Sequence, residues 1–393
     1  MKQKIFISTG EVSGDLHGGL LATAIFNEAK RRSIDIEILG LGGERMERAG
    51  VNIFHNTTSI SSIGIWEALP LVLPTLKIQK NFYKKLISSK PNCLILIDYM
   101  GPNIAIGRKL RRERISIPIY YYIAPQEWAW RVGNNSTTDL IKFSDKIFAI
   151  FKEEARFYKR RGGNVSWVGH PMIDLTRRLP TKSEARKKLK LKSKQNILLI
   201  MPASRKQEIK YLLPVFMKVA YKLQNKYPDL FVCIPSCRKE FDEKFDQALT
   251  RYKVNGKVIN GCDIESEKEN IYALSKLALC KSGTVNMEIA LNGIPQVIGY
   301  KVSRVTAFIA RKILNFKVKH ISPVNLLMKK RIVPEFVQKD FDVDKIYKKS
   351  CQLIERKNDK IKMKKGYSLV KKQLGEKGVV ERAAKEIINS FFN

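Results

Sequence analysis

The sequence predicts an α/β protein built from two Rossmann-like parallel-sheet domains in tandem. Its 393 residues exceed what one hydrophobic core usually accommodates. Short apolar runs alternate with helical patterns, which is typical of a parallel sheet. This alternation stops at a polar, Lys/Arg-rich segment and then restarts. We therefore expect a first domain over residues 1–175, a linker over 176–195, a second domain over 196–348, and basic helices over 349–393 that are candidates to pack back on the first domain.

Each predicted strand is a short apolar run that ends at small or polar residues. In the first domain the strands are expected at Lys4–Ser8, Ile34–Leu41, Cys93–Ile97, Ile117–Ile123, Lys146–Ile150 and Ser166–Gly169, with helices between them such as Leu20–Arg32 and Ile104–Arg114. In the second domain they are expected at the start of "NILLIMPASR" (196–205), in "LFVCIPS" (230–236), and at Lys257–Asn260, Leu277–Lys281 and Gln296–Tyr300, with a helix over Leu213–Tyr227. Ligands of such sheets bind beyond the carboxyl ends of the strands, so we look for the chemistry there and in the interdomain cleft.

The composition is that of a folded and strongly basic protein. Hydrophobic residues make up 44% of the chain, and 73 Lys and Arg against 37 Asp and Glu give a net charge of +36. This charge indicates an anionic partner: nucleic acid, a membrane surface or a phosphorylated substrate. The six cysteines form no zinc-ligand set, and no metal site is expected. Buried reduced cysteines, with no signal peptide or membrane span, favour a cytoplasmic protein.

The polar stretch "STGEVSGDLHGGL" (8–20) follows the first predicted strand. Its glycines match neither G-x-G-x-x-G nor a P-loop, so neither a dinucleotide nor ATP is indicated. A loop over Ser8–Asp15 that leads into a helix N-terminus could instead hold an anion or a sugar. The alternative is a tight turn in which Asp15 caps the helix.

Two further stretches of the first domain carry candidate groups. In "CLILIDYMGPN" (93–103), Asp98 ends an apolar strand, and a carboxylate is costly to bury alone. It should therefore reach the cleft, where it could act as a general base, unless it only caps a helix. The aromatic stretch "YYYIAPQEWAWRVG" (120–133), with Gln126, suits contact with a sugar or an acyl chain, but it could equally belong to the core.

The second domain offers a phosphate-binding turn in "IMPASRKQEI" (200–209). Helix-start amides beside the Arg205 guanidinium suit a diphosphate, although a plain strand–helix turn is the alternative. The stretch "CKSGTVNMEIALNGIPQVIGY" (280–300) is more specific. The small residues 282–284 allow a pyrophosphate to approach the backbone, and Glu288 could accept hydrogen bonds from ribose hydroxyls. This pattern indicates a nucleotide sugar.

Taken together, these motifs resemble the lipid-A-disaccharide synthase family of glycosyltransferases. They occur in the family order and span residues 10–338, and this collinearity is far more specific than any one motif. The matching pieces are "GEVSGDLHG", "GLGGERM", "SSIGIWEALP", "LIDYMGPN", "YYIAPQEWAWR", "VGHPMID", "PASRKQEI", "SGTVNMEIA" with "VIGYK", and "NLLMKKRIVPEFVQ".

The resemblance implies the GT-B fold and an inverting hexosyl transfer without metal or cofactor. The donor would be UDP-2,3-diacylglucosamine, the acceptor 2,3-diacylglucosamine 1-phosphate, and the products lipid A disaccharide 1-phosphate and UDP. Asp98 would be the general base for the acceptor 6-hydroxyl, and Arg205 would stabilise the leaving UDP. The residues expected to hold the nucleotide are Ser204, Arg205, Ser282, Gly283, Thr284 and Glu288. Those expected on the acceptor side are Glu11, Ser13, Gly14, Asp15 and Gln126.

This chain departs from the family pattern in three places. Ala203 replaces a glycine before Ser204, residues 100–103 lack the acid that usually follows the base, and Gln126–Glu127 replace Ser-Val. These differences leave open another GT-B enzyme that uses a UDP-sugar with a different acceptor, such as a relative of the UDP-GlcNAc 2-epimerases. A basic nucleic-acid-binding protein is a third hypothesis, but no known binding module accompanies the charge.

The basic stretch "KVSRVTAFIARKILNFKVKH" (301–320) resembles a helix that lies at a membrane surface. It has six Lys and Arg and no acid, and its apolar residues fall on one helical face. A buried amphipathic helix with a solvated basic side is the alternative. We expect peripheral association with an anionic inner membrane, and the oligomeric state stays open. The membrane-contact candidates are Arg304, Phe308, Arg311 and Lys312.

Overall fold

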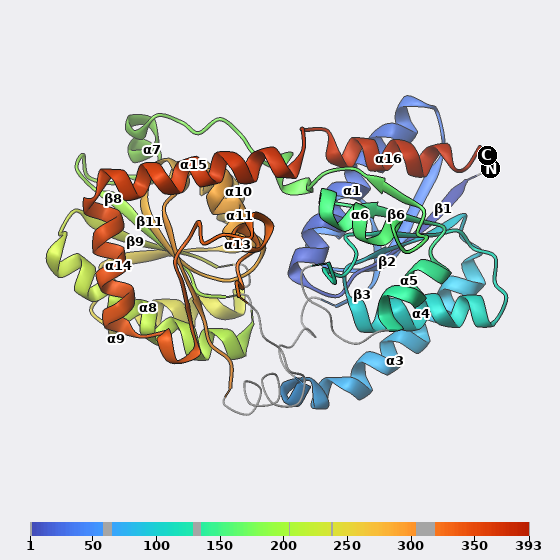
Figure 1. Ribbon diagram of the computed structural model, residues 1–393, viewed down its shortest axis with the longest axis horizontal. Helices are drawn as coiled ribbons and strands as arrows, with labels where there is room; N and C mark the ends of the chain where they lie inside the picture. The colour runs from blue at the N-terminus through green and yellow to red at the C-terminus, as the bar shows by residue number, and fades with distance from the viewer. Residues whose placement is uncertain are drawn as a thin grey trace. The chain divides into compact units, whose positions relative to one another are not determined.

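The computed structural model describes residues 2–57, 65–128, 135–203, 205–236, 239–303 and 319–392. The chain divides into two compact units (Figure 1). Unit 1 comprises Met1–Asp174 and Gln373–Asn393, and unit 2 comprises Leu175–Lys372. Each unit is a parallel sheet with helices packed on it (Figure 1), which confirms the predicted fold class.

Unit 1 contains a seven-stranded parallel sheet in the order β3-β2-β1-β4-β5-β6-β7. The order reverses between β1 and β4, which is the topological switch of a doubly wound sheet. Its strands are β1 Gln3–Ser8, β2 Ile36–Gly42, β3 Asn52–Asn56, β4 Cys93–Ile97, β5 Ile119–Tyr122, β6 Lys146–Ala149 and β7 Val165–Trp167. Its α-helices are α1 Val12–Arg31, α2 Glu44–Arg48, α3 Ile65–Ser89, α4 Met100–Arg112, α5 Asn135–Phe143, α6 Lys152–Lys159 and α16 Val379–Asn389.

Unit 2 contains a six-stranded parallel sheet in the order β10-β9-β8-β11-β12-β13. The switch falls between β8 and β11. Its strands are β8 Asn196–Met201, β9 Leu230–Pro235, β10 Gly256–Ile259, β11 Ser275–Lys281, β12 Gln296–Tyr300 and β13 Glu335–Val337. Its α-helices are α7 Lys182–Leu189, α8 Lys206–Lys226, α9 Asp242–Arg251, α10 Gly261–Leu274, α11 Thr284–Leu291, α13 Pro323–Met328, α14 Val343–Glu355 and α15 Lys357–Leu374, whose last two residues fall in unit 1.

Strands beside each switch form the centre of each core. Every side chain of β4 is fully buried, as are residues 197–200 of β8. Strands covered on both faces need apolar residues at every position, so they read as continuous apolar runs in the sequence. This is why the central strands were predicted correctly. The cysteines with described side chains, Cys93, Cys233, Cys280 and Cys351, are free and buried.

Two edge strands were not predicted. β3 reads "NIFHN" and β13 reads "EFV", and neither is a continuous apolar run. Edge strands cover less of the core, so their sequences carry a weaker apolar signal. The segment 176–195, expected as a linker, contains α7, which begins at a Thr181–Glu184 capping box and packs against α10.

The chain returns to unit 1 at its C-terminal end. There α16 packs against α1, as Figure 1 also shows. The Asp174 carboxylate caps the start of α16 by accepting hydrogen bonds from the amides of Gly378 and Val380, at 2.8 and 3.1 Å. Apolar side chains of α16, including Val379 and Ile387, are fully buried. Among the described residues, no helix is both long and apolar enough to cross a bilayer.

Candidate active site

Asp98 stands directly after β4 in a backbone conformation that L-residues rarely adopt. Its φ is 48°, and that of Tyr99 is 47°, so two consecutive non-glycine residues are left-handed. Each such residue costs about 1–3 kcal/mol and persists only where its surroundings enforce it. Strain of this kind is concentrated at active sites, so the backbone supports Asp98 as a functional residue independently of its charge.

Asn103 is the residue that enforces this conformation. Its side-chain amide donates to the carbonyls of Asp98 at 2.9 Å, Ile97 at 3.2 Å and Ser8 at 3.3 Å. Its Oδ1 accepts from the Ser8 hydroxyl at 2.8 Å, and both residues are fully buried. The Asp98 carbonyl also accepts from the Tyr121 hydroxyl at 2.7 Å. The ends of β1 and β4 are thereby fixed to each other around the strained pair.

The N-terminal loop meets the same place through Gly10. A Cβ atom on Gly10 would lie 2.1 Å from the Tyr99 ring, so only glycine allows this approach. The loop is shorter than expected, because α1 begins at Val12 with Glu11 as its N-cap. Ser13 and Gly14 thus belong to the first helical turn. Glu11 and Ser13 are partly exposed, whereas Gly14 is buried against Thr9.

Asp15 has a structural role that the sequence could not reveal. Its carboxylate accepts hydrogen bonds from the amides of Gly43 at 2.8 Å and of Arg45 and Met46, both at 3.1 Å. These are the first amides of α2, so Asp15 caps that helix from about thirty residues away. Its side chain is buried and serves the turn after β2.

Gln126 is also occupied within unit 1. Its amide donates to the Ala124 carbonyl at 3.0 Å, and its oxygen accepts from the Trp128 indole at 2.5 Å. Tyr120, Tyr121 and Tyr122 are buried in the core, so the three tyrosines do not form a sugar-binding surface.

Two buried histidines, His17 in α1 and His170 after β7, pack together. The rings of His17 and His170 lie 6.1 Å apart at an interplanar angle of 81°. Burial lowers the pKa of His17 to about 4 and that of His170 to about 3. Both rings are therefore neutral at neutral pH. Within the described part of the chain, no cluster of three His, Cys, Asp or Glu side chains could hold a metal ion.

In unit 2, Arg205 is part of a buried charged cluster that the sequence did not indicate. Its guanidinium lies 3.8 Å from the Glu208 carboxylate. Glu208 also accepts two hydrogen bonds from the Lys281 ammonium, at 2.9 and 3.0 Å. Glu208 is only 3% exposed. The cluster carries one net positive charge at the carboxyl ends of β8 and β11, where a parallel sheet binds its ligands.

The turn between β11 and α11 forms as predicted. Gly283 has a φ of 150°, and its amide donates to the Asn286 side-chain oxygen at 3.1 Å. Ser282 donates its hydroxyl to the Ile321 carbonyl at 2.6 Å. Thr284, the first residue of α11, is partly exposed. The shape of the turn is therefore fixed by hydrogen bonds of the Asn286 and Ser282 side chains.

Glu288 forms an ion pair with Lys268 of α10. Its side chain is 15% exposed, so an oxygen could still meet a ribose hydroxyl. Ser204, Arg304, Phe308, Arg311 and Lys312, which the sequence also suggested, lie outside the described residues.

Comparison with known proteins gives consistent results along the whole chain. The family model described as lipid-A-disaccharide synthetase matches residues 5–390. The lipid-A-disaccharide synthase of Prochlorococcus marinus (strain MIT 9313) is 48% identical over 386 residues, which cover 98% of each chain. That of Gloeothece citriformis (strain PCC 7424) is 42% identical and covers 98% of this chain and 99% of its own.

Solved structures show the same fold at low sequence identity. The S. aureus MnaA–UDP structure has a TM-score of 0.65 at 14% identity and covers 98% of this chain and 96% of its own. The UDP-GlcNAc 2-epimerase of Neisseria meningitidis bound to UDP-GlcNAc has a TM-score of 0.63 at 15% identity and covers both chains fully. These likenesses confirm the GT-B fold.

Replacing Asn103 by Ala should destabilise unit 1, because buried partners lose their hydrogen bonds. We expect the free energy of unfolding to fall by about 1–3 kcal/mol. All four tryptophans of the chain lie between residues 66 and 167, so tryptophan fluorescence in urea reports unit 1 alone. Asn92→Ala is the control. The exposed Asn92 side chain accepts a hydrogen bond from the Lys4 amide and so links the N-terminal ends of β1 and β4. An equal loss in both variants would contradict the assigned role.

The His17→Gln variant should change how the stability of unit 1 depends on pH. The pKa of His17 is 6.5 in the unfolded chain and about 4 in the folded chain. Below pH 6.5 the unfolded chain therefore binds a proton that the folded chain does not, and the free energy of unfolding falls as the pH is lowered. Between pH 7.5 and 5 the advantage of the unsubstituted chain should shrink by about 2 kcal/mol. Burial raises the pKa of Glu154 to about 8, so acidification increases the stability that this group contributes. This contribution is the same in both chains and cancels in their difference. A pH-independent difference in urea unfolding would refute this assignment.

Proposed function

The chain belongs to the lipid-A-disaccharide synthase family, and from that premise we propose how its own residues carry out the transfer. The protein is a glycosyltransferase of lipid A biosynthesis, and the full-length match at 48% identity is the observation that carries this conclusion. The proposed donor is UDP-2,3-diacylglucosamine, and the proposed acceptor is 2,3-diacylglucosamine 1-phosphate. UDP-bound structures with the same fold support the nucleotide part of the donor.

In the proposed mechanism, Asp98 is the general base. Its carboxylate takes the proton of the acceptor 6-hydroxyl as the hydroxyl oxygen forms its bond to the anomeric carbon, and UDP leaves with inversion. A positioned base of this kind contributes roughly 10²–10⁴-fold to a rate. The Asn103 hydrogen bonds support the role, since a base must be held at a defined distance from the proton it removes. Glu11 and Ser13, partly exposed beside the Gly10–Tyr99 contact, are the proposed acceptor contacts.

The leaving UDP is the proposed ligand of the Arg205 cluster. Its diphosphate gains negative charge as the glycosidic bond breaks, and a fixed cation stabilises that charge without reorganisation. Glu208 holds Arg205 and Lys281 in place, and the cluster keeps one net positive charge. We add Lys281 to the donor residues Arg205, Ser282, Gly283, Thr284 and Glu288. Ser204 stays a candidate from the sequence.

We also propose that the enzyme works in the cytoplasm at the surface of the inner membrane. Its substrates would carry acyl chains that partition into a bilayer, and the net charge of +36 favours an anionic surface. The membrane-contact residues Arg304, Phe308, Arg311 and Lys312 belong to this proposal on sequence grounds alone. The nucleic-acid hypothesis has only the charge in its favour, and the family assignment accounts for that charge through anionic substrates and lipids.

Asp98→Asn should abolish disaccharide formation but leave UDP binding intact. The unsubstituted enzyme, given both proposed substrates, should release UDP and form lipid A disaccharide 1-phosphate, identified by mass spectrometry. In the variant we expect kcat to fall by about 10²–10⁴-fold, because the amide cannot accept the proton. A near-normal rate would exclude Asp98 as the base. A different product from the unsubstituted enzyme would reject the acceptor and favour another UDP-sugar transfer.

Lys281→Met should weaken donor binding, because it removes one of the two cations around Glu208. We expect the donor KM to rise by about tenfold or more, from the loss of a charge-assisted interaction. Lys276→Met is the matched control, since Lys276 lies at the start of the same strand and pairs with Asp229. Circular dichroism checks that both variants fold. A similar donor KM in the two variants would remove Lys281 from the donor site.

A further inference from the structure

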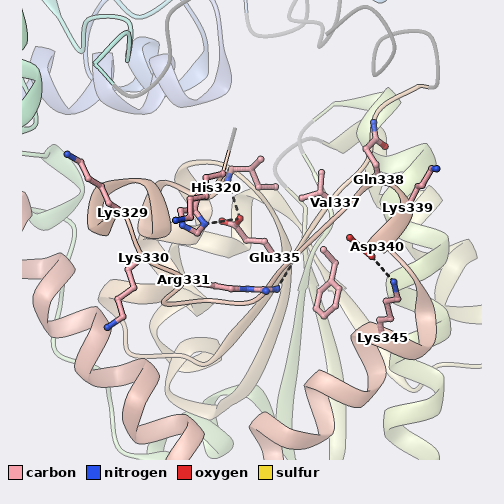
Figure 2. A pocket seen from close by; sticks show the side chains of 13 residues that line it. His320, Lys329, Lys330, Arg331, Glu335, Val337, Gln338, Lys339, Asp340 and Lys345 are labelled. Carbon is pink, nitrogen blue, oxygen red and sulfur yellow. Dashed lines mark hydrogen bonds and ion pairs between the residues drawn. The ribbon is translucent and has the colours of Figure 1, made fainter. Parts of the chain in front are cut away.

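A pocket of about 1050 Å³ lies along β13, the edge strand of the unit 2 sheet (Figure 2). Thirteen residues line it, and none of the proposed donor residues is among them. Six of the thirteen are cationic and two are acidic: Lys319, Lys329, Lys330, Arg331, Lys339 and Lys345 against Glu335 and Asp340. A concave site with this excess of positive charge concentrates anions.

The two acidic side chains do not neutralise this excess. Glu335 is directed into its own loop, where its carboxylate accepts from the amides of Ile321 and Ser322 at 3.2 and 2.8 Å and from the Asn325 side chain at 2.8 Å. Asp340 pairs with Lys345 at 2.6 Å, and this hydrogen bond lowers the pKa of Asp340. Both carboxylates are therefore satisfied without a ligand.

Four lysines of the pocket remain without a described carboxylate partner. They are exposed, and the structure shows no ion pair for them within residues 319–392 or the other described ranges: Lys319, Lys329, Lys330 and Lys339. Figure 2 shows Lys329 and Lys330 on one side of Glu335 and Lys339 on the other. Their ammonium groups are directed outward on both sides, so together they make the surroundings of the pocket positive rather than all contacting one ligand atom.

A buried group in the same pocket also lacks a partner. His320 is 9% exposed, and its Nε2 is buried with no hydrogen-bond partner in the part of the chain that the structure describes. Its Nδ1 lies 3.8 Å from the Glu335 carboxylate. An unsatisfied buried nitrogen costs about 1–3 kcal/mol, so it points to a ligand that supplies the missing partner. When Nε2 carries a ring hydrogen, it donates, and a phosphate oxygen supplies the acceptor that it lacks.

We propose that this pocket is a second anion site that binds a phosphate ester. Phosphate combines multiple negative charges with several acceptor oxygens, which matches the lysines and His320 Nε2 together. The volume exceeds that of a single phosphate ion and suits an ester with its organic part, such as a glycerophosphate group. Ile321, which lines the pocket, accepts a hydrogen bond from Ser282, so the site adjoins the turn assigned to the donor without sharing its residues.

The test compares two triple variants of the full chain that lose equal charge. The pocket variant carries Lys329→Gln, Lys330→Gln and Lys339→Gln. The control carries Lys182→Gln, Lys187→Gln and Lys188→Gln in α7, where these lysines are exposed. We expect the pocket variant to bind a phosphate probe about 100-fold more weakly than the control, since each lysine near an anionic group contributes roughly fivefold. Equal affinities of the two variants would show that the lysines act only through the general charge of the protein, and would overturn the proposal.

Two probes separate the sources of the phosphate. Glycerol 3-phosphate, titrated by calorimetry, represents a free ester, and vesicles of phosphatidylglycerol in phosphatidylcholine, followed by sedimentation, represent a lipid headgroup. A pocket-specific loss with glycerol 3-phosphate supports a free ester, and a loss with vesicles alone supports a headgroup. If the unsubstituted chain binds neither probe, the proposal is wrong. Both experiments measure binding to the pocket and not glycosyl transfer. A negative result here therefore leaves the proposed transfer untouched, and a failure of the proposed transfer leaves the pocket untouched.

His320→Phe tests the buried donor separately, because it keeps a ring but removes both nitrogens. A folded variant, checked by circular dichroism, should lose several-fold in affinity for the probe that the unsubstituted chain binds. Unchanged affinity in the folded variant would show that Nε2 does not meet the ligand and would overturn this geometry of the site.

Discussion

The proposed acceptor half of the site depends on one buried side chain. Asn103 joins the carboxyl ends of β1 and β4 and holds the left-handed backbone of Asp98. Its amide can meet four partners at once only because both strands end at the same level of a parallel sheet. Gly10 completes the arrangement by leaving room for the Tyr99 ring. The strained loop is therefore stabilised by hydrogen bonds to the ends of the sheet strands.

Electrostatics organise unit 2 in a different way. Glu208 is buried between Arg205 and Lys281, where a lone carboxylate would be strongly destabilising. With two cations around it the cluster is stable and still positive, so its field is fixed before the proposed diphosphate binds. The pocket along β13 differs in that its carboxylates already have hydrogen-bond partners and do not hold four of its exposed lysines in place. One unit thus contains a preorganised cation and a more adaptable cationic surface.

The sequence predicted what depends on local pattern and missed what depends on distant neighbours. The positions of Asp98 and of the turn at residues 282–284 were predicted correctly because each follows an apolar central strand, and such strands are recognisable alone. Asn103 looked like part of an irregular motif, because its partner Ser8 lies about ninety-five residues away in β1. Asp15 looked like a ligand contact, yet it caps α2, whose first amides follow it by about thirty residues. Lys281 was likewise hidden, since only folding brings it to Glu208.

The return of α16 to unit 1 constrains how the protein is made. The ribosome releases residues 1–174 long before it translates Val379–Asn389, which cover α1 and receive the Asp174 cap. During that interval the surface of α1 that α16 covers lies open, and unit 1 is completed only after Val379–Asn389 have been translated. Unit 2, which needs no residue after Lys372, can close first. The order in which the two units can be completed is therefore the reverse of the usual N-to-C order of domain folding.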